Sequence, residues 1–363
     1  MIRYIDSPAV SLNWSRRSFL RAAMVGACAV SPLAMAFQTP LQIPAMHSSL
    51  IARSPLLDVA CLGKRIVAAG VRGGILFSDD TGQSWKQAQV PVSTDLVALA
   101  FPSAALGWAV GHGGVVLHTE DGGQTWGKQL DGAAASKLAI DYYESNSATV
   151  PEAGQFLERE RSLAVEGETQ PFMDVFFVDE RRGYVVGTFN RIFMTEDGGQ
   201  SWQPQMHLTE NPGELHFYSV CGIDDQLYLA GEQGKVWRRD SASGRFVAAD
   251  TPYSGTLFGV LPCASDLLFA YGMRGSFYRS TDRGASWEKI QSPTQGGITT
   301  ALALSDGRVF IADQSGGVAI SKDSGRHFTA LKVANPMAYA GASVLSENAI
   351  VMVGALGVRI ETV

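Results

Sequence analysis

The chain has 363 residues, of which 46% are hydrophobic and 18% are charged, and its formal net charge is −6. Its 39 glycines and 15 prolines are too few for a collagen-like or low-complexity protein, and its hydrophobic content excludes a disordered one. At about 150 residues per domain the length favours two domains, unless internal repeats build one larger unit.

The first 36 residues are typical of an export signal. A twin arginine, Arg16 and Arg17, stands before Ser-Phe-Leu, and a weakly apolar stretch over residues 22–36 ends in Ala-Met-Ala. This stretch is shorter than the roughly 20 apolar residues that cross a bilayer. The pattern resembles a twin-arginine translocation signal, so we expect a mature chain from residue 37 that works outside the cytoplasm.

The charge and cysteine content of residues 37–363 restrict the partners. Four arginines and one aspartate lie in the signal, so the mature chain would carry 25 basic and 34 acidic residues, a net charge of −9. This balance argues against nucleic acid and against bulk adhesion to anionic lipid. Any association with a membrane is expected to be peripheral rather than integral. Three cysteines remain, and Cys221 and Cys263 could pair or could stay as buried strand thiols.

A unit of about 41 residues repeats seven times. Each copy has an apolar run, then Gly-x-x-Gly, then Ser/Thr-x-Asp-x-Gly-x-x-Trp in the best copies. The first glycine falls at positions 70, 111, 187, 231, 272 and 354, and an aspartate replaces it at 313. Four short strands per copy, separated by glycine turns, predict an all-β fold: a seven-bladed β-propeller of four-stranded blades.

The seventh copy reaches Val363 after its third strand. Propellers usually complete their last blade with a strand from the other end of the chain, so residues 41–49 are the predicted closing strand of blade 7. Such a strand would leave no unpaired edge that invites association. We therefore expect residues 37–363 to form one monomeric propeller.

The Ser/Thr-x-Asp-x-Gly-x-x-Trp segment matches the Asp-box, also called the bacterial neuraminidase repeat. The Asp should accept N–H groups of a tight turn, the Gly should adopt positive φ, and the Trp should bury its ring. Each copy supplies about one carboxylate where calcium takes about six to eight oxygens, so we predict a structural role and no metal. The predicted structural residues are Asp80, Trp85, Asp121, Trp126, Asp197, Trp202, Asp282, Trp287, Asp323 and Phe328.

One spacing of 76 residues exceeds the period by about 35. The excess, residues 131–170, predicts a helical insert between blades 2 and 3, with helices over 133–143 and 151–165. In a propeller this connection lies on the face of the Gly-x-x-Gly turns, opposite the Asp-boxes. The variable residues of these turns are therefore the candidate binding surface. They are Arg72, His112, Phe189, Arg191, Glu232, Arg274 and Gln314.

These repeats, with copies such as residues 119–126, and the export signal resemble the photosystem II stability and assembly factor family. The resemblance implies a non-enzymatic scaffold without cofactors, in the periplasm or, in a photosynthetic organism, in the thylakoid lumen. Its implied partner is a membrane or exported protein, such as a membrane complex or transporter, held by a basic patch on one propeller face. Arg72, Arg191 and Arg274 are candidates for that patch by position alone.

The alternative, from a different class, is a sialidase-like Asp-box glycoside hydrolase that acts on extracytoplasmic glycans. Sialidases need an arginine cluster, a Tyr nucleophile and a supporting Glu. They also place an Arg directly before Ile-Pro, where this chain has Gln42 before Ile43 and Pro44. No acid pair is evident, so the sequence favours the scaffold and no catalytic residue is assigned.

Overall fold

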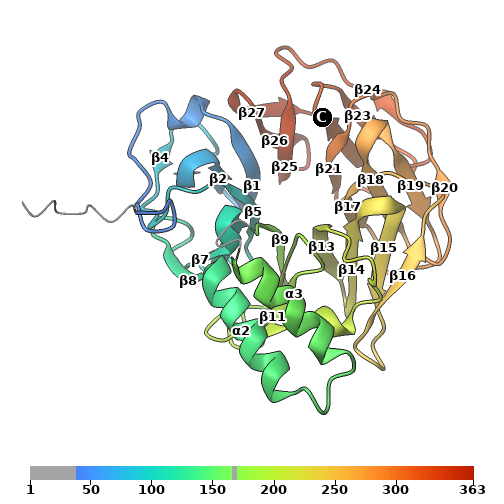
Figure 1. Cartoon of the computed structure of the whole chain (residues 1–363). Helices are drawn as coiled ribbons and strands as arrows, with labels where there is room; N and C mark the ends of the chain where they lie inside the picture. Colours follow the sequence, from blue (N-terminus) through green and yellow to red (C-terminus); the bar gives the residue numbers. More distant parts are fainter. Residues whose placement is uncertain (1–37, 166–169) are drawn as a thin grey trace, which may run out of the picture. The chain divides into compact units, whose positions relative to one another are not determined.

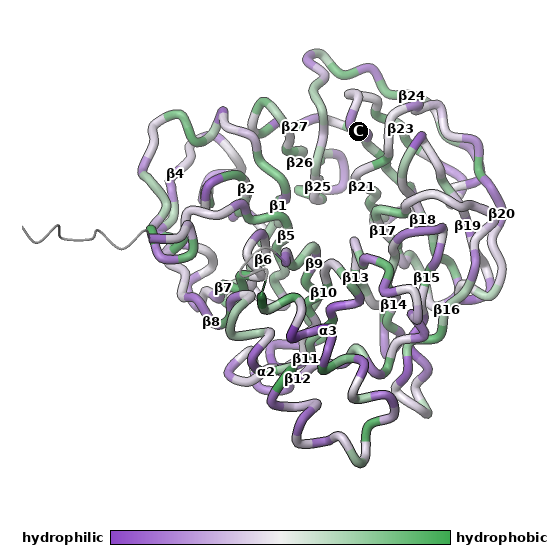
Figure 2. Tube along the Cα trace, viewed as in Figure 1, coloured by the Kyte–Doolittle hydropathy of each residue, from purple (hydrophilic) through white to green (hydrophobic). Residues whose placement is uncertain are grey.

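In the computed structural model, residues 38–165 and 170–363 are described, and residues 39–363 form a compact unit. Seven antiparallel sheets surround a centre, which confirms the predicted seven-bladed propeller (Figure 1). Hydrophobic stretches follow the inner strands, and hydrophilic residues gather in the outer turns (Figure 2). The predicted export signal lies outside the described residues.

Each blade runs outward from the centre in chain order. Blade 1 contains β1 (Leu56–Leu62), β2 (Arg65–Gly70), β3 (Ile75–Ser78) and β4 (Lys86–Gln87). Blade 2 contains β5 (Leu96–Ala100), β6 (Gly107–Gly111), β7 (Val115–Thr119) and β8 (Gly127–Leu130). Blade 3 contains β9 (Phe172–Phe177), β10 (Gly183–Gly187), β11 (Ile192–Thr195) and β12 (Gln203–Pro204).

The remaining blades follow the same order. Blade 4 contains β13 (Phe217–Ile223), β14 (Gln226–Gly231), β15 (Lys235–Arg239) and β16 (Phe246–Asp250). Blade 5 contains β17 (Leu257–Pro262), β18 (Leu268–Gly272), β19 (Phe277–Ser280) and β20 (Glu288–Lys289). Blade 6 contains β21 (Ile298–Ala303), β22 (Val309–Asp313), β23 (Val318–Ser321) and β24 (Thr329–Ala330), and blade 7 contains β25 (Tyr339–Ser346), β26 (Ala349–Gly354) and β27 (Gly357–Thr362).

The predicted closing strand over residues 41–49 is wrong. These residues form no strand, and they lie against blade 1, where the Ala45 N–H donates to the Val90 carbonyl at 3.0 Å. Blade 7 instead closes the ring by packing on blade 1, through a buried cluster that includes Leu56, Val59, Val351 and Val353. Side-chain packing between blades therefore replaces strand exchange, and blade 7 has three strands in the described chain.

The Asp-boxes tie the turns on one face of the ring. The Asp121 carboxylate accepts the N–H groups of Gln124 and Thr125, each at 2.9 Å, and the Thr119 hydroxyl at 2.8 Å. Gly123 adopts φ 89, which a side chain would resist, and its carbonyl accepts the buried Trp126 indole N–H.

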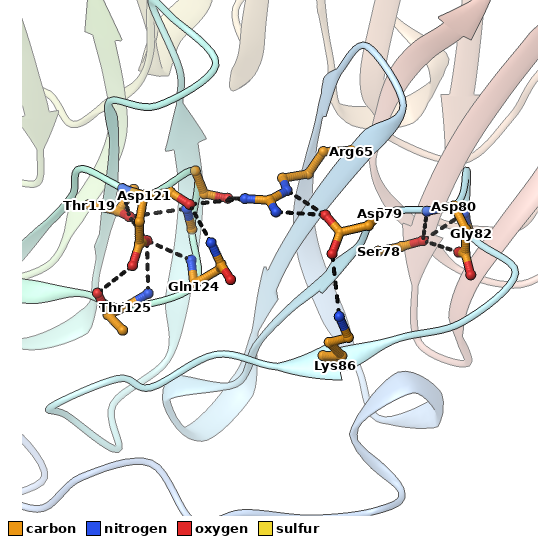
Figure 3. Close-up of polar contacts among 12 residues, drawn as sticks. Arg65, Ser78, Asp79, Asp80, Gly82, Lys86, Thr119, Asp121, Gln124 and Thr125 are labelled. Carbon is orange, nitrogen blue, oxygen red and sulfur yellow. Dashed lines mark hydrogen bonds and ion pairs between the residues drawn. The ribbon is translucent and has the colours of Figure 1, made fainter.

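Arg65 links the boxes of blades 1 and 2. Its guanidinium pairs with Asp79 at 2.6 Å and donates to the Asp121 carbonyl at 2.9 Å (Figure 3). The boxes of blades 2, 3, 5 and 6 each offer a carbonyl in the same way to a side chain of the preceding blade.

The Asp121→Ala variant should lose about 1–3 kcal/mol of its free energy of unfolding, because several turn donors lose their shared acceptor. Urea denaturation measures the loss. Glu120→Ala in the same turn is the control, since the Glu120 side chain is exposed and forms no hydrogen bond with the described residues, whereas the adjacent Asp121 holds the turn. Equal losses in both variants would contradict the structural role of the box.

The predicted helical insert lies between blades 2 and 3. It consists of α2 (Gly132–Ser145) and α3 (Ala153–Val165), close to the predicted ranges. The Asp131 side chain caps α2 by accepting the Ala134 N–H at 3.1 Å. The buried face of α2, formed by Ala135, Ala139 and Tyr143, joins the core cluster of blades 2 to 4.

The three described cysteines, Cys61, Cys221 and Cys263, are free thiols, so Cys221 and Cys263 are not paired. Burial raises the pKa of Cys263 to about 12 and raises that of Cys221 further, which keeps both thiols protonated at neutral pH. Within residues 38–165 and 170–363, no helix is long and apolar enough to cross a membrane. The same residues hold no cluster of three or more metal-ligating side chains.

Candidate binding face

The connections between second and third strands form one face of the ring, which we call the turn face. Its turns are Val71–Gly73, His112–Gly114, Glu232–Gly234, Met273–Gly275 and residues 188–190, 314–316 and 355–356. Helix α2 packs on the His112–Gly114 turn, so the insert lies on this face as expected. The sequence predicted the candidate binding residues on this face.

A tight fit between blades explains the first glycine of each repeat. A Cβ on Gly70 would lie 2.4 Å from the Pro55 carbonyl oxygen, and one on Gly111 would lie 2.0 Å from that of Asp95. Neither contact can be tolerated, so a side chain is excluded there. In blade 6 Asp313 takes this place, beside Gly296 and Gly297, and its carboxylate accepts the Gly317 N–H at 2.7 Å.

Five candidate residues lie at the turn face as predicted by position. Arg72 and Arg274 are exposed at the left-handed positions of their turns, with φ 55 and φ 58. His112 is also exposed, and its Nδ1 lies 3.9 Å from an Asp95 carboxylate oxygen. Glu232 is half-buried and accepts the His216 N–H at 2.9 Å, so it braces the turn. Gln314 is exposed in the blade 6 turn.

Phe189 lies between the insert and blade 4. The Arg159 guanidinium stands 4.6 Å from its ring centroid, and the His216 ring lies 4.7 Å away in an edge contact. Arg159 also pairs with Glu214 at 2.9 Å. Phe189 is half-buried, so it helps to hold helix α3 in place and presents part of its ring to the solvent.

Arg191 does not belong to the accessible surface. It is fully buried beneath the insert, where its Nη2 lies 3.2 Å from both the Glu160 carboxylate and the Ser136 hydroxyl. Its guanidinium lies near the rings of Phe172 and Phe193. The expectation that Arg191 contacts a partner is therefore wrong, because residues of the insert fold over it.

A ring of bulged residues at the mouth of the channel was not foreseen from the sequence. Every inner strand has a β-bulge directly after the residue that pairs with the first glycine of the repeat or with Asp313. A bulge re-aims the extra side chain away from the regular alternation. The bulged residues, all half-buried, are Leu57, Val97, Met173, Tyr218, Phe258, Thr299 and Ala340.

The mouth is aromatic on the side of the insert. Ring centroids follow one another from Phe189 to His216 at 4.7 Å, from His216 to Tyr218 at 6.5 Å, and from Tyr218 to Phe258 at 6.1 Å. This run connects the insert with the inner strands of blades 4 and 5. Half-exposed aromatic rings with a polar edge are well suited to binding polypeptide.

Two carboxylates follow the bulges of blades 1 and 3. Asp58 accepts the Leu99 N–H of blade 2 at 2.8 Å, and Asp174 accepts the Val220 N–H of blade 4 at 2.8 Å. Both are half-buried in the ring, and dehydration raises the pKa of Asp58 to about 6 and that of Asp174 to about 7. The hydrogen bonds oppose this shift without cancelling it.

A second group of charges lies on the opposite face, between blades 4 and 5. Arg238, Arg239 and Arg283 line a cavity of about 180 Å³ with Asp240, and these three arginines form no ion pair within the described chain. Arg239 occupies the position at which complete Asp-boxes have a buried Ser or Thr. The loss of the Asp-box pattern in the fourth repeat was the sequence feature that could have indicated this group of arginines.

Comparisons with known proteins agree with the repeat pattern. The family model described as photosynthesis system II assembly factor YCF48 matches residues 77–147 and 158–308, which include most of the insert. The photosystem II stability/assembly factor HCF136 of Arabidopsis thaliana is 21% identical over 275 residues, which cover 68% of this chain and 60% of that protein. The photosystem II assembly lipoprotein Ycf48 of Synechococcus is 20% identical over 227 residues, 62% of this chain and 58% of that protein. The chain thus spans about 60% of the length of these curated relatives.

Solved structures show the same fold. A structure of YCF48 bound to a D1 peptide has a TM-score of 0.63 at 17% identity and covers 88% of this chain and 99% of its own. The WD40 propeller domain of Doa1 has a TM-score of 0.62 at 8% identity, with 88% and 96% covered, so structural likeness at this level shows the fold alone. The family model matches well over half of the chain, and this protein therefore belongs to the photosynthesis system II assembly factor YCF48 family.

Proposed function

We propose that this protein is an exported, non-enzymatic assembly factor that holds a segment of a membrane or exported protein against its turn face. Family membership supports the assembly role, and a related YCF48 has been solved with a D1 peptide bound. The twin arginine at Arg16 and Arg17 supports export in the folded state to the periplasm, or to a thylakoid lumen.

The observation that carries the choice of face is the ring of bulged residues at the channel mouth. Six of its seven members are apolar or aromatic, and all are half-buried, so they offer contact area without being committed to the core. Arg72 and Arg274 stand exposed at the surrounding turns. An extended segment with apolar side chains and acidic neighbours is complementary to this surface.

The Tyr218→Ala/Phe258→Ala variant should recover about tenfold less of its partner, because interface energy concentrates in a few aromatic contacts. Chemical crosslinking of the exported protein in its own cells, followed by mass spectrometry, identifies and quantifies the partners. The control is Val247→Ala, since Val247 is 40% exposed on the outer strand of blade 4, away from the mouth. An unchanged set of partners in the aromatic variant would overturn the assignment of the face.

A different assay distinguishes the proposed scaffold from the glycoside hydrolase alternative. Turnover of a panel of sialosides and other glycosides, lost in Arg72→Ala or Arg274→Ala, would favour an enzyme over a scaffold. We expect no turnover. Most glycosidases need two carboxyl groups placed on either side of the scissile bond, whereas a scaffold that binds polypeptide at an apolar mouth does not.

A further inference from the structure

The outer edge of blade 7 differs from the other edges of the ring. The other blades have a fourth strand, but no strand of the described residues pairs with the outer side of β27. The sequence assigned residues 41–49 to this place, and the structure puts them against blade 1. The prediction of a monomer depended on that closing strand. Without it, the outer side of β27 is an unpaired edge, and such edges favour association with another strand.

The backbone of β27 presents three residues outward. The Val363 N–H donates to the Asn348 carbonyl at 3.0 Å, which points the odd-numbered residues of this strand toward β26. Because hydrogen-bonding groups alternate along an antiparallel strand, Val358, Ile360 and Thr362 face away from β26. The side chain of Arg359 donates to the Val358 carbonyl at 2.8 Å, a contact that a partner strand would replace.

The side chains of β27 are complementary to those of the same strand turned by 180°. If two copies pair antiparallel about Ile360, each Arg359 stands opposite a Glu361, and Ile360 stands opposite its own copy. In the same register Val358 pairs with Thr362, so the outward-facing residues meet outward-facing residues. A shift by one residue would place Arg359 opposite Ile360 and lose both charge pairs.

The surroundings of the edge are apolar and accessible. Ile360 is 41% exposed and Leu356, in the turn before β27, is 54% exposed. The Gly357 end lies beside Ala52 of the short helix η1 (Ile51–Arg53), which covers the start of the strand and leaves its middle free. On the side of blade 1, the Ile360 side chain lies against the Gly82 turn, since a Cβ on Gly82 would stand 2.6 Å from the Ile360 Cδ1.

We propose that β27 pairs antiparallel with β27 of a second copy, forming a two-fold symmetric dimer with a continuous six-stranded sheet. One short strand pair buries less than the roughly 1,200 Å² of a stable interface, so the dimer is reversible and concentration-dependent. This association does not depend on the turn face and leaves that surface free on both copies.

Sedimentation velocity of the purified protein from about 1 to about 300 µM covers the range of a weak dimer. We expect a monomer–dimer equilibrium in the original protein. Arg359→Glu alone, or Glu361→Arg alone, puts like charges opposite each other at two symmetric places and should weaken association at least about tenfold. The double exchange Arg359→Glu/Glu361→Arg restores both opposite-charge pairs and should restore the dimer.

Lys289→Glu is the matched control, since Lys289 lies exposed on the outer strand of blade 5, and it should leave association unchanged. Circular dichroism of each variant confirms the fold. A protein that stays monomeric over the whole range overturns the proposal and leaves the edge to a strand of another protein. If the single exchanges leave the affinity of the dimer unchanged, or the double exchange does not restore it, the dimer uses another surface and the proposal is also overturned.

Discussion

The Glu160→Ala variant should lose about 3–5 kcal/mol of its free energy of unfolding, the cost of leaving a buried charge without its partner. Arg191 and Glu160 are almost wholly buried, and their closest N–O distance is 3.2 Å. Burial raises the pKa of Glu160, an effect that the Arg191 charge opposes, and it lowers the pKa of Arg191. Without the carboxylate, Nη2 of Arg191 keeps the Ser136 hydroxyl at 3.2 Å, while Nε and Nη1 have no hydrogen-bond partner among the described residues.

Urea denaturation measures this loss, and hydrogen exchange of α2 and α3 shows whether the insert opens first. The control is Glu158→Ala on the same helix, which breaks an exposed pair with Arg161 and should cost less than about 1 kcal/mol. The double change Arg191→Met/Glu160→Leu removes both charges and should recover most of the stability. Equal losses for Glu158→Ala and Glu160→Ala would show that the buried pair does not anchor the insert.

The blade count and the position of the insert follow from the sequence because both depend on local spacing. The first glycine of a repeat marks a place where two backbones approach too closely for a side chain, as at Gly70 and Gly111. Such a constraint recurs in six of seven copies, so it remains visible without any relative. The helices of the insert have their own composition, and Asp131 caps the first of them.

Features that depend on which other segments pack against a residue could not be predicted from the local sequence pattern. Position in a turn placed Arg191 on the surface, but α2 and α3 cover it, and nothing in the turn itself records that contact. The closing strand failed for the same reason, since residues 41–49 were assigned by analogy to an edge they do not reach. The bulges require a register between strands, which one strand alone does not encode.

The contribution of Asp58 and Asp174 to stability should grow as the pH falls from about 8 to about 5.5, because both carboxyl groups bind protons more tightly in the folded state than in the unfolded state. Their pKa values, about 6 and about 7, lie above the ordinary value of 3.8. A carboxyl group with a raised pKa stabilises the fold when protonated and loses that contribution as the pH rises through its folded pKa. Both side chains retain some contact with solvent, so we expect a gain of about 1–3 kcal/mol rather than the full shift.

The groups around the two aspartates do not reverse this sign. Asp58 and Asp174 repel each other when ionised, and Cys221 on β13 and Tyr271 on β18, whose pKa values are also raised by burial, remain neutral here. Elsewhere, burial lowers the pKa values of His118 and His207, which removes stability below about pH 6.5. The Asp-box carboxylates, such as Asp282 with a pKa of about 2, act only at lower pH.

A variant isolates the contribution of the aspartates from that of the histidines. Melting temperature is measured against pH for the original protein and for Asp58→Asn/Asp174→Asn, which keeps the size of both side chains but cannot titrate. The difference between the two curves should change by the expected 1–3 kcal/mol, about 1.5–4.5 °C for a folded unit of this length, between pH 5.5 and pH 8, with the original protein gaining toward acid. Asp141→Asn on the exposed face of α2 should leave the profile unchanged. Parallel curves for the original protein and the double variant would mean that the two carboxylates are as well hydrated in the ring as in the unfolded chain.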